Sequence, residues 1–230
     1  ETAYAPTHKR PRSLHTGRCP ITVPYSVMSL FSLLGALEIG LIFSLVALGV
    51  LISFRILNFP DLTVDGSFPM GGAVAATLIA GGHDPFMSTL GGTLAGAVAG
   101  FITGWLNVRL KIMDLLASIL MMIALYSVNL RIMGKPNVPL ISEPTIFSLL
   151  QPEWMPDYVF RPVLLGVVVV VVKLLVDWFF STQIGLSLRA TGANPRMARA
   201  QGVATGAATL AGMALSNALV ALAGELYAQT

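Results

Sequence analysis

Three arginines and a helix break share one short segment, GLSLRATGANPRMARAQGV (Gly185–Val203). Arg189, Arg196 and Arg199 have no acidic residue between them, and long apolar runs flank the segment on both sides. The pattern therefore predicts a basic, broken-helix segment from which Arg196 and Arg199 project positive charge, although an ordinary basic loop that follows membrane topology rules fits it as well.

The same segment carries signals that end one helix and begin another. We expect the helix that leaves the preceding apolar run to break at Thr191–Gly192. Asn194 is a favourable N-cap and Pro195 is tolerated at the first helical position, so a short helix is predicted over residues 195–201. Gly202 would end that helix.

A second polar segment, NFPDLTVDGSFPMGGAV (58–74), interrupts apolar sequence with prolines and glycines. Backbone groups freed by such residues at membrane depth must be buried in protein or line a cavity, and discontinuous helices often form the substrate region of transporters. An ordinary loop, with Pro60 and Asp61 as turn and cap residues, is the open alternative. The candidate residues of a translocation path are Asn58, Asp61, Thr63, Asp65 and Ser67.

No constellation for catalysis, metal binding or nucleotide binding is found in the sequence. Gly134–Lys135 is followed by Pro136 and lacks the glycine spacing of a phosphate loop, and neither HExxH nor GxSxG occurs. The three histidines are scattered, and the single Cys19 excludes an intrachain disulfide. We expect no catalytic residue, no metal and no cofactor in this chain.

The composition is that of an integral membrane protein. Of 230 residues, 55% are hydrophobic and 11% charged, with a mean hydropathy of +0.77, whereas soluble domains carry about 25% charged residues. The net charge of +3 does not indicate nucleic-acid binding, because the basic residues fall mostly in the N-terminal tail and between apolar runs.

Six apolar runs predict an all-α polytopic bundle, because about 20 helical residues cross the hydrocarbon core. The runs cover residues 30–57, 68–80, 86–106, 115–132, 162–180 and 203–228. If 185–203 is cytoplasmic, the acidic 134–161 loop lies outside and the N-terminus lies outside too. The basic tail conflicts with that orientation, so either the second run is re-entrant or the tail is a weak topology signal, and we prefer the second interpretation.

Glycine recurs every four residues in the third run, at Gly92, Gly96, Gly100 and Gly104. On a helix these positions form a smooth stripe that lets another backbone approach closely. We expect the stripe to pack helices, within the subunit or across a dimer, with a pathway lining as the minor alternative.

Four ionisable residues lie within or beside the apolar runs. Lys173 and Asp177 are four residues apart, so they share a helix face and can neutralise each other. A structural pair is favoured over a role in a transport pathway, because long side chains near a span end can reach the interface. Glu38 and Glu225 lie near span ends, where we expect interfacial carboxylates.

Two regions are predicted. Residues 1–27 form a polar, disordered tail, and residues 28–230 form the membrane domain. The chain stops directly after the sixth apolar run, so we expect further residues or a partner to cover the open side of the bundle.

GLSLRATGANPRMARAQGV resembles the cytoplasmic coupling segment of ABC importer permeases of the branched-chain amino acid and ribose-type family. The family pattern matches Gly185, Leu188, Arg189, Ala190, Gly192, Asn194, Ala198 and Gly202. LNFPDLTVDGSFPMGGAVAA (57–76) is similar to a second signature, found in a subgroup that is paired with an aromatic amino acid-type solute-binding protein. The resemblance covers residues 28–230.

The resemblance implies a type II-like ABC importer permease in the bacterial plasma (inner) membrane, with a coupling helix in the segment 194–202. An ATP-binding subunit would dock there and use the ATP. Its other implied partners are a solute-binding protein, a second permease copy in a homodimer, and the lipid bilayer, with no nucleic acid. The implied ATPase-coupling residues are Arg189, Gly192, Asn194, Pro195, Arg196, Ala198, Arg199 and Gly202.

Two other classes remain open. An ion-coupled secondary transporter or channel would use Lys173, Asp177 and Glu38 as an ion relay. A structural membrane scaffold would bind no ATPase.

Overall fold

The computed structural model describes residues 30–135, 138, 140, 145–150 and 157–230. These residues are almost entirely helical, and the predicted tail 1–27 lies outside them. The elements are α1 (Leu30–Leu51), the π-helical turn η1 (Ile52–Ile56), α2 (Val64–Ala80), α3 (Pro85–Leu110), α4 (Asp114–Met133), α5 (Ile146–Leu150), α6 (Asp157–Ser181), α7 (Gln183–Ala193), α8 (Pro195–Ala200) and α9 (Thr205–Gln229).

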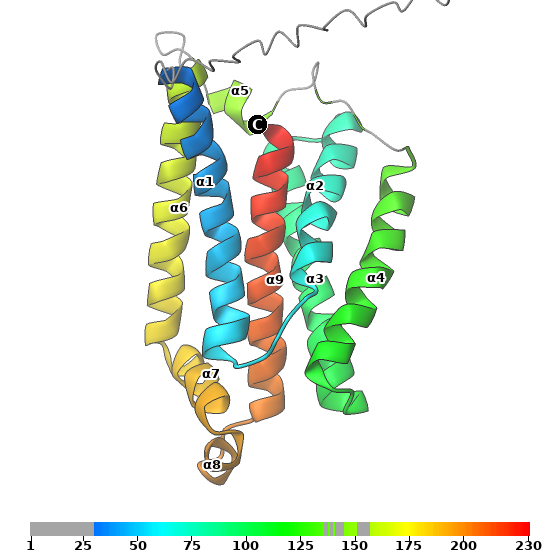
Figure 1. The fold of residues 1–230 in the computed structure, drawn as a ribbon, viewed down its shortest axis with the longest axis vertical. Coiled ribbons are helices and arrows are strands. Elements are labelled where there is room, and N and C mark those ends of the chain that lie inside the picture. Colours follow the sequence, from blue (N-terminus) through cyan, green and yellow to red (C-terminus); the bar gives the residue numbers. More distant parts are fainter. Residues whose placement is uncertain (1–29, 136–137, 139, 141–144, 151–156) are drawn as a thin grey trace, which may run out of the picture.

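The helices α1, α2, α3, α4, α6 and α9 run along the length of the bundle (Figure 1). Within the described residues, five helices are long and apolar enough to cross a membrane, and α2 is a shorter apolar helix. The sixth crossing combines the extended segment 57–63, which climbs beside α9, with α2 (Figure 1). The prediction of an all-α polytopic membrane protein is confirmed, and α1 begins at the end opposite α8.

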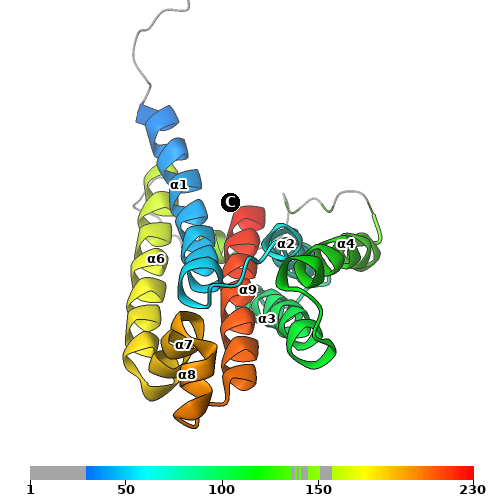
Figure 2. The same cartoon turned by 60° about the horizontal axis from the view of Figure 1, so that its bottom comes forward.

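The core is built around α9, which packs against α1, α2 and α3. Figure 2 shows α9 between the α1–α6 pair and the group formed by α2, α3 and α4. Half of the α9 span is buried within the chain, against 17% for α6 and 22% for α4. The two outer helices expose apolar side chains, as lipid-facing helices do.

The glycine stripe of α3 faces α9. A Cβ on residue 96 would lie 2.7 Å from the Asn217 carbonyl oxygen, and a Cβ on residue 100 would lie 2.7 Å from the Asn217 Cβ. Both added atoms would also overlap other α9 atoms at shorter range, whereas a Cβ on Gly104 would lie 3.3 Å from Leu210. The stripe thus brings two backbones together within one chain.

Lys173 and Asp177 form an ion pair on α6, with Nζ 2.5 Å from Oδ2. Both side chains are more than half exposed. The pair therefore lies on an outward face of the bundle and lines none of the cavities described below.

Candidate functional site at the basic end of the bundle

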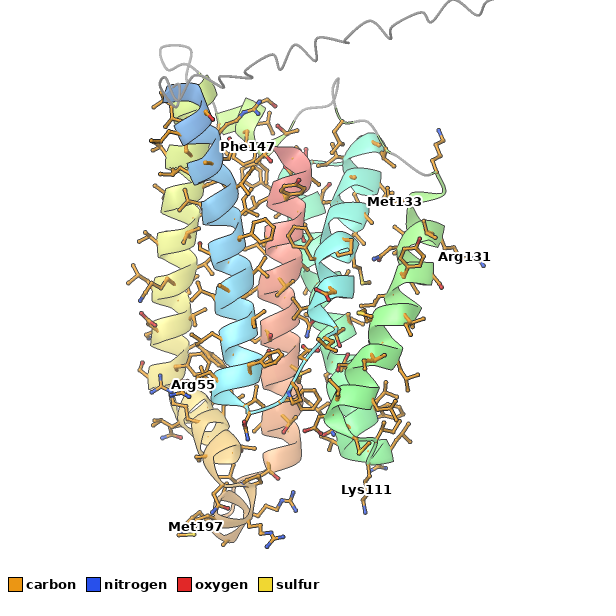
Figure 3. The ribbon with its side chains drawn as sticks, viewed as in Figure 1. Arg55, Lys111, Arg131, Met133, Phe147 and Met197 are labelled. Carbon is orange, nitrogen blue, oxygen red and sulfur yellow. The ribbon has the colours of Figure 1, made fainter. Side chains whose placement is uncertain are left out.

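One end of the bundle gathers basic side chains, and we call it the basic end. Arg55, Lys111 and Met197 all lie at this end, whereas Arg131 lies toward the other (Figure 3). The basic residues on its elements are Arg55, Arg109, Lys111, Arg189, Arg196 and Arg199. Lys and Arg accumulate on the cytoplasmic side of membrane proteins, so this charge pattern favours a cytoplasmic position for the basic end.

The helix α8 projects from the basic end (Figure 1). The Asn194 side-chain oxygen accepts hydrogen bonds from the backbone N–H groups of Arg196 and Met197, both at 3.1 Å, so Asn194 caps the helix that begins at Pro195. Gly202, with a φ of 82°, follows its last turn. The short helix predicted over 195–201 is present as Pro195–Ala200.

The helix break lies elsewhere than the sequence predicted. We expected it at Thr191–Gly192, but α7 continues through both residues to Ala193, and the chain turns at Asn194. The earlier break is at Thr182, whose hydroxyl caps the start of α7 by accepting from the Gly185 N–H. Gly192 does not break a helix, so its lack of a side chain serves another purpose.

That purpose is a backbone contact with η1. A Cβ on Gly192 would lie 2.9 Å from the Ile56 carbonyl carbon and closer still to its oxygen, so no other residue fits without movement. Leu188, one turn earlier, is fully buried beside Leu57. The segment α7 is therefore packed directly onto the start of the extended segment 57–63.

The three arginines of this region have different surroundings. The Arg189 guanidinium lies 5.3 Å from the Phe180 ring centroid, a cation–π distance. Arg199 donates from Nε to the Thr205 hydroxyl at 2.9 Å, which ties α8 to α9. Arg196 is exposed, as is the neighbouring Met197 at 61%. Ala198 is buried and turns the other face of α8 toward the bundle.

The extended segment is held by a buried polar network. Asp61 accepts a hydrogen bond from the Thr63 N–H at 2.8 Å and one from the Asn217 side-chain amide at 2.7 Å. The Asn217 amide oxygen in turn accepts from the Ser67 hydroxyl at 2.6 Å. The hydroxyls of Thr63 and Thr103 lie 3.0 Å apart. All five side chains are at most 2% exposed, so the carboxylate near the start of α2 is fully enclosed.

The five candidate path residues therefore fall into two groups. Asp61, Thr63 and Ser67 are buried in the network and hold the extended segment against α9 and α3. Asn58 and Asp65 are exposed, and they line different cavities. Of the five, Asn58 alone lines the large cavity at the basic end.

That cavity has a volume of about 810 Å³. It lies where the extended segment, the α3–α4 turn, the α7–α8 region and the start of α9 meet. Its polar lining includes Asn58, Asn107, Lys111, Asp114, Thr191, Arg199, Thr205 and Thr209. Asn58 and Lys111 both have a φ of 55°, and among the described residues they are the two non-glycine positions with positive φ. Backbone strain of this kind clusters at functional sites.

Sequence reasoning missed the partners of the extended segment. Asn217 and Thr103 complete the network from α9 and α3, and Asn129 of α4 donates to the Gly66 carbonyl at 3.2 Å. An asparagine inside an apolar run is costly unless it is paired, and that signal was available in the sequence at Asn217 and Asn129. Among the described residues, no group of three His, Cys, Asp or Glu side chains could hold a metal ion.

Residues 32–230 match the family described as the permease component of branched-chain amino acid transport systems. The chain belongs to this permease family. The permease is 39% identical over 191 residues to the tyrosine transport system permease protein of Clostridioides difficile (strain R20291), a match that covers 83% of this chain and 62% of that protein. It therefore spans less than two thirds of the length of that relative.

A second relative is an uncharacterized protein of Rickettsia prowazekii (strain Madrid E), 36% identical over 199 residues, which are 86% of this chain and 68% of that protein. No solved structure matches the permease. The family and the apolar helices make it a multi-pass protein of the bacterial inner membrane.

Proposed function

We propose that the permease forms the translocation path of an ATP-driven importer, coupled through α8 to a separate ATP-binding subunit. The observation that carries this proposal is the position of α8, which projects from the basic end and is joined through α7 to the extended segment at Gly192. A solute-binding protein would deliver the solute at the opposite end, and a second copy of the permease would complete the path.

The docking surface on α8 combines charge with an apolar anchor. Arg196 and Met197 are both exposed on this helix. Arginine with an exposed apolar neighbour suits an acidic groove, because the guanidinium binds carboxylates and the apolar side chain is buried on contact. Arg199 has a second role, since its bond to Thr205 holds α8 in place.

Movement of α8 would reach the path through close contacts. Gly192 is packed on the Ile56 backbone, and a Cβ on Gly212 of α9 would overlap both Leu57 and Leu188. Tightly packed elements have little freedom to deform, so they shift together as bodies. Displacement of α8 by an ATP-binding subunit would therefore move the extended segment and change the large cavity that Asn58 lines.

The solute is proposed to be an amino acid, with an aromatic side chain among the candidates. The name of the Clostridioides relative, a tyrosine transport permease, supports this class. A cavity of about 810 Å³ is within the usual range of small-molecule sites. The large cavity is then the cytoplasmic part of the path.

Co-purification tests the coupling. Arg196→Glu should abolish recovery of the ATP-binding subunit with the full-length permease, because it places a carboxylate opposite an acidic groove. Arg131→Glu, at the opposite end, is the matched charge-reversal control and should leave recovery unchanged. Both variants should insert into the membrane like the wild type. Unchanged recovery with Arg196→Glu would contradict the docking proposal.

Reconstitution separates this proposal from the ion-coupled alternative. Vesicles that contain the permease alone should move no labelled tyrosine under a proton or sodium gradient. Transport under such a gradient, lost in Lys173→Ala, would overturn the ATP-driven proposal in favour of a secondary transporter.

A further inference from the structure

The carboxyl group of Glu225 lies inside the bundle. The residue is 0% exposed, so the expectation of an interfacial carboxylate is wrong for this position. Gly92 leaves the space that the carboxyl group fills: a Cβ on residue 92 would lie 2.7 Å from the Glu225 carboxyl carbon and closer to Oε1. The sequence alone could not reveal this, because the space is provided by another helix.

The surroundings of the Glu225 carboxyl group suit an acid better than an anion. The same point beside Gly92 is 2.8 Å from the Gly71 carbonyl oxygen, so a backbone oxygen and the carboxyl group converge there. Oε2 is buried and has no hydrogen-bond partner. An ionised carboxylate that is buried near a backbone oxygen, with an unsatisfied oxygen of its own, carries a large desolvation cost.

The hydrogen bonds of Thr93 also favour a protonated Glu225. The Thr93 hydroxyl lies 2.9 Å from the Thr89 carbonyl oxygen and 3.3 Å from Glu225 Oε1. A hydroxyl has one proton. When Thr93 donates it over the shorter distance to Thr89, a hydrogen bond between its oxygen and Glu225 needs the proton of a carboxylic acid.

Among the described residues, no charged side chain compensates Glu225. The titratable groups on α9, on the elements packed against it, or beside those elements, are Glu38, Arg55, Asp61, Asp65, His83, Asp84, Arg109, Lys111, Arg161, Arg189, Arg196, Arg199 and Tyr227. Within the described residues none of these is hydrogen-bonded or ion-paired to Glu225, whose one side-chain partner is Thr93. Arg161 instead donates to the Thr230 carbonyl at 2.7 Å.

We propose that Glu225 is a proton-binding site, at which the carboxylic acid donates to the Thr93 hydroxyl and joins α9 to α2 and α3. Loss of the proton would leave a buried anion with an unsatisfied oxygen near the Gly71 backbone and loosen this junction. Protonation of Glu225 therefore stabilises the packing of the three helices in a pH-dependent way.

A column of polar groups connects the site to the outer end of the bundle. Gln229, one turn after Glu225, donates to the Thr89 hydroxyl at 3.1 Å and accepts from the Ile146 N–H of α5 at 3.2 Å. These groups give the site a polar connection toward the non-cytoplasmic medium, and the pH of that medium would set its occupancy.

Infrared spectroscopy of the full-length permease in lipid nanodiscs tests the proposal. With glutamate labelled by ¹³C, the wild type at neutral pH should show the carbonyl band of a protonated carboxylic acid. Glu225→Gln should lose that band, whereas Glu38→Gln, which removes a partly exposed carboxylate, should retain it. Absence of the band in the wild type, or its survival in Glu225→Gln, would overturn the proposal.

Thermal unfolding gives an independent readout. The wild type should unfold at lower temperature as the pH rises, because deprotonation then costs stability. Glu225→Gln keeps the shape without the titrating group and should have a weaker pH dependence, while Glu38→Gln should behave like the wild type. Equal pH dependence of the unfolding temperature in the wild type and both variants would contradict a stabilising proton on Glu225. Stabilisation of the wild type by added Na⁺ at fixed pH, lost in Glu225→Gln, would assign the site to a cation and overturn the proton assignment.

Discussion

The glycines of α3 differ in how much space α9 leaves beside them. Glycine-to-alanine substitution is therefore predicted to destabilise the protein at some positions of the stripe and to be neutral or stabilising at another. At residues 96 and 100 an added Cβ would lie 2.7 Å from an atom of Asn217. At both positions it would overlap a second α9 atom at shorter range, and at residue 100 that atom is a backbone oxygen. At Gly104 the nearest atom, in the Leu210 side chain, would be 3.3 Å away. Real Cβ atoms essentially never come within 3.0 Å of a neighbour, so of these three positions residues 96 and 100 force the helices apart and residue 104 does not.

Gly100→Ala should therefore destabilise the permease, at the upper end of the range of about 1–3 kcal/mol for overpacking. The better helix propensity of alanine offsets about 1 kcal/mol of this cost. The free energy of unfolding should therefore fall by about 2 kcal/mol. Gly96→Ala would press on the same residue, Asn217, so the double variant should lose between about 2 and 4 kcal/mol, less than the sum of the two effects. At roughly 2–4 °C per kcal/mol, its unfolding temperature should fall by about 4–16 °C.

The assay is thermal unfolding of the purified full-length permease in one detergent. Gly104→Ala should be neutral or slightly stabilising, and Gly40→Ala, where a Cβ would meet nothing within 4 Å, controls for propensity alone. The reasoning is refuted if Gly100→Ala unfolds at the same temperature as Gly104→Ala.

Two further predictions concern the connection between α8 and the path. Gly192→Ala should push α7 away from the Ile56 backbone and reduce solute uptake, while the ATP-binding subunit still co-purifies; uptake at the wild-type level, measured in cells at equal expression, would contradict it. Asn217→Leu should remove the hydrogen bond that the amide donates to the buried Asp61 carboxyl group and cost about 1–3 kcal/mol, the penalty for leaving a buried polar group unsatisfied. Asn107→Leu, a change of the same type at a half-buried position, should cost less in the same unfolding assay.

Much of the fold follows from the sequence because the bilayer imposes simple requirements. A span needs about 20 apolar residues, so hydropathy locates the long helices. The cap at Asn194 and the helix start at Pro195 depend on local chemistry and could be predicted as well. Small residues every four positions indicate a close helix contact before its partner is known.

The remaining features depend on contacts between distant residues. Asp61 and Asn217 are 156 positions apart, and no local signal pairs them. The role of Gly192 was misassigned because a glycine that permits a backbone contact has the same sequence appearance as one that ends a helix. Glu225 lies near the end of an apolar run, as an interfacial residue would, and it is buried because Gly92 of another helix leaves space for its carboxyl group.

Site-specific crosslinking at α8 tests the central claim most directly. In a background with Cys19→Ser, a cysteine at the exposed Met197 should form a crosslink to the ATP-binding subunit in membranes that contain the assembled importer. Met87→Cys, on a residue equally exposed but at the start of α3 at the opposite end, should form none. Crosslinking from Met87 and none from Met197 would contradict the account.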